Sequence, residues 1–150
     1  MRAENYSGLF VFIQMIWQKE VVLNEYPRGM HLVSHMLERE LPAMPVSGLL
    51  NIFIKHTSAA ISLNENADPT VRTDLDNFFN RLVKEREAWY NHTFEGDDDM
   101  PAHIKSSLIG CSLTIPIQNY QLALGVWQGI YLCEFRDYGG HRKILSTIYS

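Results

Sequence analysis

The chain has 150 residues, of which 46% are hydrophobic and 20% are charged, and its formal net charge is −4. This length and composition predict one folded domain with a real core and exclude a largely disordered chain. The basic residues are scattered, so no electrostatic footprint for a nucleic-acid partner is present. No apolar run reaches the ~20 residues that span a bilayer, so we expect no membrane partner.

Two further features indicate the compartment. The apolar stretch 9–17 contains Gln14 and has no small-residue cleavage site, unlike a secretion signal. Cys111 and Cys133 lie far apart within apolar runs, which predicts buried free thiols in a reducing compartment. We therefore expect a cytoplasmic protein.

The first half of the chain alternates strand and helix signals. Residues 9–23 are rich in Val, Ile, Phe and Trp, which favours a strand, and residues 26–29 read as a turn. A short helix is expected over 34–41 before two prolines. Residues 49–54 and 59–63 predict two further strands.

The clearest predicted helix follows Asp68, a suitable N-cap, and Pro69, a suitable first helical residue. Apolar residues then recur with helical spacing from Val71 to Val83, which predicts one apolar face. Burying that face contributes about 1.5–3 kcal/mol for each large side chain.

The second half begins with a polar connection over 86–100 and a brief helix over 101–109, stopped by Gly110. Four strands are expected next, with a tight hairpin at Asn119-Tyr120; they span 112–117, 122–126, 129–135 and 143–149. This order predicts a single α+β domain over residues 1–150, with a largely antiparallel or mixed sheet.

Asp97, Asp98 and Asp99 stand directly before the predicted helix that contains His103 and Lys105. Acids suit the positive end of a helix dipole, but three in a row exceed what a cap requires. Their mutual repulsion calls for a cation, a lysine or open water. The segment therefore predicts a polar site, with a metal ion as the favoured occupant.

The histidines His56, His92 and His103 are the candidate metal ligands. His103 lies near a helix start, which favours a neutral imidazole. Each has a structural alternative, because a hydrogen-bonded or solvated histidine is common and no HExxH or CxxC spacing occurs.

Two loops supply further candidates. Glu65 and Asn64 end a strand, where carboxylates often point into a cleft. Trp127 and Gln128 stand between two glycines, where a ligand role and simple core packing are equally plausible. Arg136 follows a strand among other charged residues, and an ion-pair cluster is its structural alternative.

Several motifs together resemble the YjbQ family of secondary thiamine-phosphate synthases. They are His56-Thr57-Ser58-Ala59, Asn64-Glu65-Asn66-Ala67-Asp68-Pro69, Asp98-Asp99-Met100-Pro101-Ala102-His103-Ile104-Lys105, Leu124-Gly125 and Trp127-Gln128-Gly129-Ile130-Tyr131-Leu132. The resemblance implies a compact α+β fold, a homotrimer and a polar site built from these histidines and acids. It also implies a weak ability to join a pyrimidine diphosphate to a thiazole phosphate. Asp97 departs from the proline of many relatives, and Val126 from a common threonine.

Three hypotheses follow. In the first, Asp97, Asp98 and Asp99 hold a divalent ion on the pyrophosphate of a small-molecule phosphate substrate. Trp127 or Tyr131 would stack on its ring, and Arg136 or Lys105 would contact its phosphate. In the second, His56, His92 and His103 bind zinc rather than magnesium, and Glu65 acts as the base of a hydrolase. In the third, the cluster stabilises a non-catalytic trimeric binding protein. Asn64, Glu65, Gln128 and Arg136 are the candidate catalytic residues.

Overall fold

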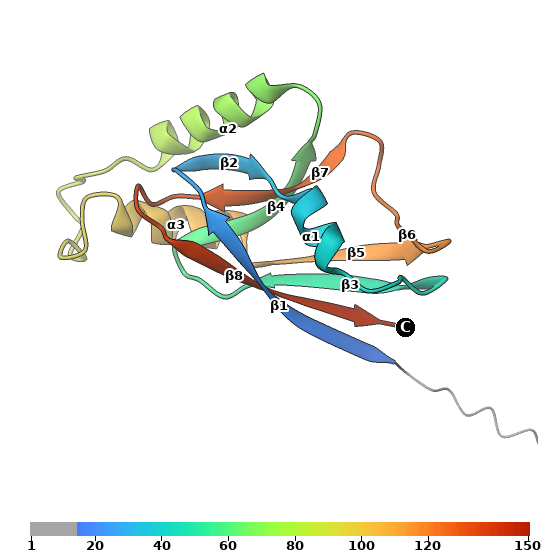
Figure 1. Ribbon diagram of the computed structural model, residues 1–150. Coiled ribbons are helices and arrows are strands. Elements are labelled where there is room, and N and C mark those ends of the chain that lie inside the picture. The colour runs from blue at the N-terminus through green and yellow to red at the C-terminus, as the bar shows by residue number, and fades with distance from the viewer. Residues whose placement is uncertain (1–14) are drawn as a thin grey trace, which may run out of the picture.

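The computed structural model describes residues 15–150, which form two antiparallel sheets and three helices (Figure 1). The five-stranded sheet has the order β1-β8-β3-β5-β6, with β1 (Ile16–Glu25), β8 (His141–Tyr149), β3 (Ser47–Ile54), β5 (Ser112–Gln118) and β6 (Gln121–Leu122). The three-stranded sheet has the order β2-β7-β4, with β2 (Gly29–Leu32), β7 (Gln128–Glu134) and β4 (Ala59–Glu65). The helices are α1 (Ser34–Glu40), α2 (Pro69–Leu82) and α3 (Asp99–Ile109). The predicted α+β fold is confirmed.

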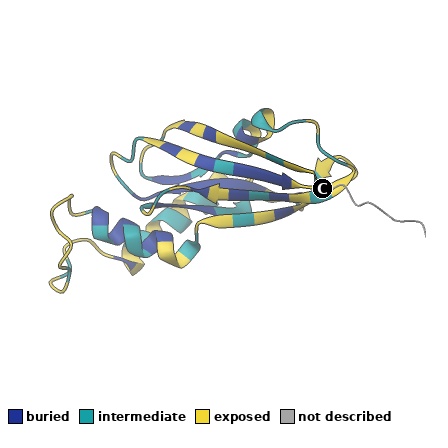
Figure 2. Cartoon of the chain, turned by 90° about the horizontal axis from the view of Figure 1, so that it is seen from below, coloured by how far each residue is buried: buried dark blue, intermediate teal, exposed yellow. Residues whose placement is uncertain are grey.

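The main core lies between the two sheets. Leu50 and Ile52 of β3 face Ile61 of β4 and Ile130 and Leu132 of β7 in one buried cluster. Buried and exposed residues alternate along β3 and β5, as Figure 2 shows from below, because one face of the five-stranded sheet meets this core and the other meets solvent.

A second core lies between the three-stranded sheet and the helices α2 and α3, whereas Leu37 of α1 belongs to the main core. Tyr131 and Cys133 of β7 point to this side and pack with Ala102 of α3 and Phe79 of α2. The sheet is therefore covered on both faces, and β7, its central strand, is buried at every position from Gly129 to Glu134. That explains why β7 reads as a continuous apolar run rather than an alternating one.

Helix α2 is placed as predicted but is less buried than its sequence suggested. Asp68 caps it, accepting from the Thr70 N–H over 2.8 Å, and Pro69 is its first residue. Phe79 packs on the second core, yet Phe78 and Leu82 are 56% and 57% exposed. The single apolar face that we expected to be buried is thus partly open to solvent.

Most other predicted ends of helices and strands lie within two residues of the observed ones, and the exceptions are as follows. The expected strand 122–126 reduces to the two residues of β6, because the chain leaves the sheet at the turn that precedes β7. The part of the first predicted strand over 9–14 lies outside the described residues. Cys111 is exposed rather than buried, whereas Cys133 is buried as expected.

The hairpin between β5 and β6 turns at Asn119 and Tyr120, which both have positive φ, +51° and +64°. Two consecutive left-handed residues suit the twist of a two-residue hairpin. Among residues 15–150, no helix is both long enough and apolar enough to cross a membrane.

Candidate functional site

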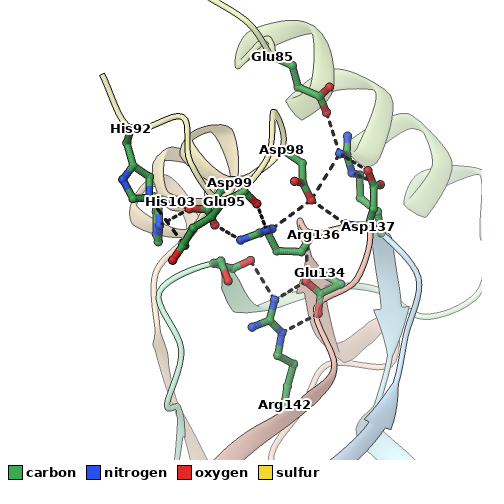
Figure 3. Close-up of polar contacts among 12 residues, drawn as sticks. Glu85, His92, Glu95, Asp98, Asp99, His103, Glu134, Arg136, Asp137 and Arg142 are labelled. Carbon is green, nitrogen blue, oxygen red and sulfur yellow. Dashed lines mark hydrogen bonds and ion pairs between the residues drawn. The ribbon is translucent and has the colours of Figure 1, made fainter. Parts of the chain in front are cut away.

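One carboxylate and two imidazoles meet at the start of α3 (Figure 3). Asp99 begins α3 and His103 follows one turn later, so both lie on one face of the helix, while His92 comes from the connection after α2. Nε2 of His92 lies 2.7 Å from Oδ2 of Asp99, and Nε2 of His103 lies 3.3 Å from the same oxygen. The three ligand atoms lie within 4.8 Å of one another, an arrangement that suits a three-ligand metal site.

Arg136, which follows β7, holds the Asp99 carboxylate. Asp99 is 1% exposed, and its Oδ1 accepts from Nη1 of Arg136. Nε of Arg136 donates to Oδ2 of Asp98 over 3.0 Å, and Nη2 donates to the Glu95 carbonyl over 2.7 Å. Burial alone would raise the pKa of Asp98, but hydrogen bonds from the Asp137 N–H and Arg136 outweigh it and hold that pKa below its usual value.

The three consecutive acids contact different groups instead of converging on one ion. Asp97 pairs with Arg86 at the surface, with 2.6 Å between Oδ2 and Nε. Asp98 binds Arg136 and also accepts from a backbone N–H. Of the three, only Asp99 belongs to a cluster of ligand atoms in the described part of the chain. A magnesium ion held jointly by all three acids does not fit this arrangement.

A buried ion pair supports the cluster from below (Figure 3). Glu134 and Arg142 are 0% and 4% exposed and form two hydrogen bonds of 2.6 Å. Oε1 of Glu134 also accepts from the backbone N–H of Arg136 over 3.0 Å. This bidentate pair ties β7 to β8 and fixes the backbone that carries Arg136.

The hydrogen bonds of His103 determine which of its nitrogens carries hydrogen. Nδ1 lies 3.0 Å from the carbonyl oxygen of Thr57, and a carbonyl only accepts, so Nδ1 donates. In the neutral ring Nε2 then holds a lone pair, which faces Oδ2 of Asp99. Two acceptors that face each other need a proton or a cation between them. A backbone carbonyl on the far nitrogen is a usual partner of a metal-binding histidine.

His56 is not part of this cluster, although we expected it beside the other two histidines. Its Nε2 accepts from the backbone N–H of Lys143 over 2.8 Å. Burial lowers the pKa of His56, and the nearby Arg142 cation lowers it further. Within this chain the accepting nitrogen of His56 is occupied, and Asp99 takes the place of the third ligand.

Lys105, expected at a substrate phosphate, is 2% exposed and faces α2. Its Nζ donates to Oδ1 of Asn80 over 2.5 Å and lies 5.7 Å from the centre of the Phe135 ring. Burial lowers the pKa of Lys105, and Arg28 lowers it further. The lysine joins α2 to α3 instead of reaching the cluster.

Four other expected site residues lie at the opposite end of the three-stranded sheet: Asn64, Glu65, Trp127 and Gln128. Glu65 pairs with Gln128, whereas Ala59 pairs with Glu134. The strand from Ala59 to Glu65 spans about 20 Å at 3.3 Å per residue. In a single chain these residues are therefore separated from the cluster that contains Arg136.

The polar side chains at that far end shape local turns. Oδ1 of Asn64 accepts from the Glu65 N–H, and Oε1 of Gln128 accepts from the Gly125 N–H, both over 2.8 Å. Oε1 of Glu65 lies 3.4 Å from the Asp68 N–H. Trp127 is 64% exposed, so it does not pack in the core.

Two residues of the site escaped the sequence analysis, Glu95 and Arg142. Oε2 of Glu95 lies 3.9 Å from Nε2 of His92, but no pattern marks it within its polar loop. Arg142 had a usable signal, because Glu134 stands in an apolar strand and a buried carboxylate requires a cation or hydrogen-bond donors.

Comparisons with known proteins agree with this architecture. The family model described as "UPF0047 protein YjbQ-like" matches residues 19–150. The UPF0047 protein YjbQ of Salmonella typhimurium is 47% identical over 136 residues, which are 89% of this chain and 98% of that protein. The UPF0047 protein MJ1081 of Methanocaldococcus jannaschii is 37% identical over 82% of this chain and 86% of its own.

Solved structures give the same result. A YjbQ/UPF0047 protein from Clostridium acetobutylicum is 34% identical, with a TM-score of 0.73, and the match covers 87% of this chain and 98% of that one. A YbjQ-like protein of unknown function from Sulfolobus solfataricus shares the fold, with a TM-score of 0.81 at 20% identity over 92% of this chain and 99% of that one. The chain therefore belongs to the YjbQ (UPF0047) family.

Proposed function

We propose that the protein is a metal-dependent enzyme whose ion, of the zinc class, is bound by His92, Asp99 and His103. The observation that carries the proposal is the orientation of His103. Its Nδ1 donates to the Thr57 carbonyl, so in the neutral ring the Nε2 lone pair faces a carboxylate oxygen 3.3 Å away. A cation between these two acceptors satisfies both.

The donor set supports zinc over magnesium, because imidazole nitrogen suits zinc and magnesium prefers oxygen. Zinc bonds of 2.0–2.1 Å in a tetrahedron separate the ligand atoms by roughly 3.4 Å, close to the 3.3 Å between His103 and Asp99. Nε2 of His92 and Oδ2 of Asp99 are at hydrogen-bond distance, 2.7 Å, so zinc binding requires these two atoms to move apart by about 0.7 Å. Three protein ligands leave a fourth position, where bound zinc supplies Lewis acidity and a water of lowered pKa.

Hydrolysis of small phosphate or carboxylate esters is the reaction class that this site supports best. Glu95 is the carboxylate placed to take a proton, with Oε2 3.9 Å from Nε2 of His92. It replaces Glu65, which we expected in this role and which lies at the far end of β4. Arg136 keeps one oxygen of Asp99 directed at the imidazoles.

Thiamine-phosphate synthesis is a second candidate reaction at the same centre. An ion bound by the two histidines and Asp99 would neutralise a pyrophosphate leaving group. Asp97 and Asp98 pair with Arg86 and Arg136 instead, so they add no ligand to that ion.

The experiment that tests the metal centre is elemental analysis of untagged protein beside His103→Ala. His35→Ala is the matched control, because His35 is an exposed histidine on α1, outside the cluster. We expect about one zinc per chain in wild type and in the control, and none in His103→Ala. Wild-type protein that takes up no transition metal would refute the proposal.

Activity assays then test which reaction the protein catalyses and whether Glu95 or Glu65 is the base. Zinc-loaded protein is assayed for hydrolysis of phosphate and carboxylate esters and for formation of thiamine phosphate. Glu95→Gln should lose ester hydrolysis by about 100-fold or more while keeping its zinc, and Glu65→Gln should stay active. Ester hydrolysis that survives in Glu95→Gln excludes that residue as the base.

A homotrimer, which the resemblance implied, stays part of the proposal. Exposed apolar side chains on the open face of the five-stranded sheet support an assembly, among them Leu49 of β3 and Tyr149 of β8. Light scattering of wild type and His103→Ala tests this and the non-catalytic alternative together. A cluster that only stabilises an interface predicts that His103→Ala dissociates the trimer.

A further inference from the structure

A cavity of about 710 Å³ adjoins the histidine–carboxylate cluster, between the end of β3 and α3. Its wall includes Phe53 and Ile54 of β3, Ser107 of α3 and Cys111 just beyond that helix. His103 belongs both to this wall and to the cluster. A molecule bound at the open position of a metal centre here would have this space beside it.

The cavity wall is mainly apolar. Phe53 is 40% exposed, which leaves much of its ring free, and Cys111 presents an accessible thiol. The polar groups nearby are already used within the fold, since the Ser107 hydroxyl donates to the His103 carbonyl and the Thr57 carbonyl accepts from His103. The volume falls within the range of small-molecule sites, and the space is open to solvent on one side.

A divalent ion at the cluster would favour an anionic oxygen group on such a molecule, because zinc accepts oxygen ligands. Arg136 and Asp98 offset each other as a pair. The Asp99 and Glu95 carboxylates together balance the two charges of the ion, so the anionic group is held by coordination rather than by excess positive charge. Lys55 adds a cation at the cavity, and its Nζ forms an ion pair with Oε2 of Glu20 at 2.6 Å. The site thus offers a metal ion beside His103 and an apolar wall beyond it.

We propose that this cavity binds the apolar body of a small substrate whose anionic oxygen group, a phosphate or a carboxylate, coordinates the metal. The proposal rests on the metal centre described above and assigns the substrate side of that centre. Phe53 and Cys111 contact the apolar body. His103 lies where the cavity meets the metal centre, beside the bond that joins the apolar body to the anionic group.

The two cysteines give a direct binding assay. Cys111 lies in the cavity wall and is exposed, whereas Cys133 is buried, so a thiol reagent under native conditions reports on the cavity. Zinc-loaded protein is treated with the thiol reagent in the presence of increasing concentrations of phenylphosphonate, methylphosphonate or benzoate. We expect phenylphosphonate to protect Cys111 with a Kd about tenfold below that of methylphosphonate, because only its ring fills the apolar space.

The comparison of phenylphosphonate with benzoate shows whether the anionic group of the substrate is a phosphate or a carboxylate. Protection by phenylphosphonate alone assigns a phosphate ester to the site, and equal protection by benzoate assigns a carboxylate. Either result supports the proposal.

A cavity-filling variant supplies the second readout. Ser107→Trp places an indole in the space from an exposed helix position, and Leu108→Trp is its control because Leu108 is 59% exposed and outside the cavity wall. Ser107→Trp should reduce phenylphosphonate affinity to the level of methylphosphonate while zinc content stays unchanged. Bound zinc with equal Kd values for both phosphonates in wild type overturns the cavity assignment alone. Absence of zinc in wild type overturns the metal centre and the assignment with it.

Discussion

Nη1 of Arg136 donates to Oδ1 of Asp99, and this contact leaves the other oxygen of that carboxylate directed at His92 and His103. The two residues come from opposite halves of the site, one after β7 and one at the start of α3. Because a guanidinium presents a planar fork of donors, it fixes the orientation of the carboxylate as well as its charge. The arrangement explains how a single aspartate can serve two imidazoles.

The first prediction concerns this orientation. Arg136→Lys keeps the positive charge but loses the fork that holds Asp98, Asp99 and the Glu95 carbonyl together. Zinc affinity should fall about 10- to 100-fold, the usual effect of removing a partner of a metal ligand. Competition with a zinc chelator measures it. Arg86→Lys, at a surface pair, is the control, and equal affinities in the two variants would contradict the prediction.

The second prediction concerns the buried pair below the cluster. Glu134→Gln leaves Arg142 buried with a neutral partner, so the free energy of unfolding should fall by about 3–5 kcal/mol. Urea denaturation measures the change. Glu40→Gln breaks an exposed pair with Lys19, which solvent screens, and should lower the free energy of unfolding far less. Similar losses in both variants would show that the buried Glu134–Arg142 pair contributes no more to the free energy of unfolding than an exposed pair does.

The third prediction concerns the thiols. Burial raises the pKa of Cys133 to about 12, so this residue has almost no thiolate at neutral pH, whereas Cys111 is exposed. A thiol reagent should therefore modify one cysteine per native chain and two in guanidinium chloride. Cys111→Ser should abolish the native reaction. Modification of both thiols in the native protein would contradict the burial of Cys133.

Local signals in the sequence predicted the local structure well. The Asp68-Pro69 pair marked the start of α2, and Asn119-Tyr120 marked the hairpin, because caps and turns depend on residues adjacent in the chain. The strand expected over 122–126 was wrong because a strand also needs a hydrogen-bonded neighbour that can lie far away in the sequence. Its residues suit a strand, but the last backbone bond to β5 runs from the Ala123 N–H to the Pro116 carbonyl, and the ladder ends there.

The site was predicted only in part, because its geometry depends on contacts across the fold. His92, Asp99 and His103 were all candidates, yet nothing local showed that these three converge while His56 binds a backbone N–H instead. Glu65 was a reasonable base until the antiparallel register of β4 and β7 placed it at the far end of the sheet. Which residues share a site was decided by strand register, which a single sequence does not display.

The last prediction concerns His56 and pH. Burial, together with the Arg142 cation, lowers the pKa of His56 in the folded protein below its unfolded value of about 6.5. As pH falls through about 6.5, the unfolded chain takes up a proton at this residue and the folded chain does not. His56 therefore makes the folded state less stable as the solution is acidified, and its contribution is fully favourable only above that pH.

His56→Gln isolates this contribution, because an amide oxygen can accept the Lys143 N–H and cannot titrate. Urea denaturation of both proteins at about pH 8 and about pH 5.5 gives four unfolding free energies. Wild type should lose more stability on acidification than the variant, since other titrating groups affect both proteins alike. An equal loss in both would show that His56 accepts its proton as readily in the folded state as in the unfolded chain, against the effect of burial and of Arg142.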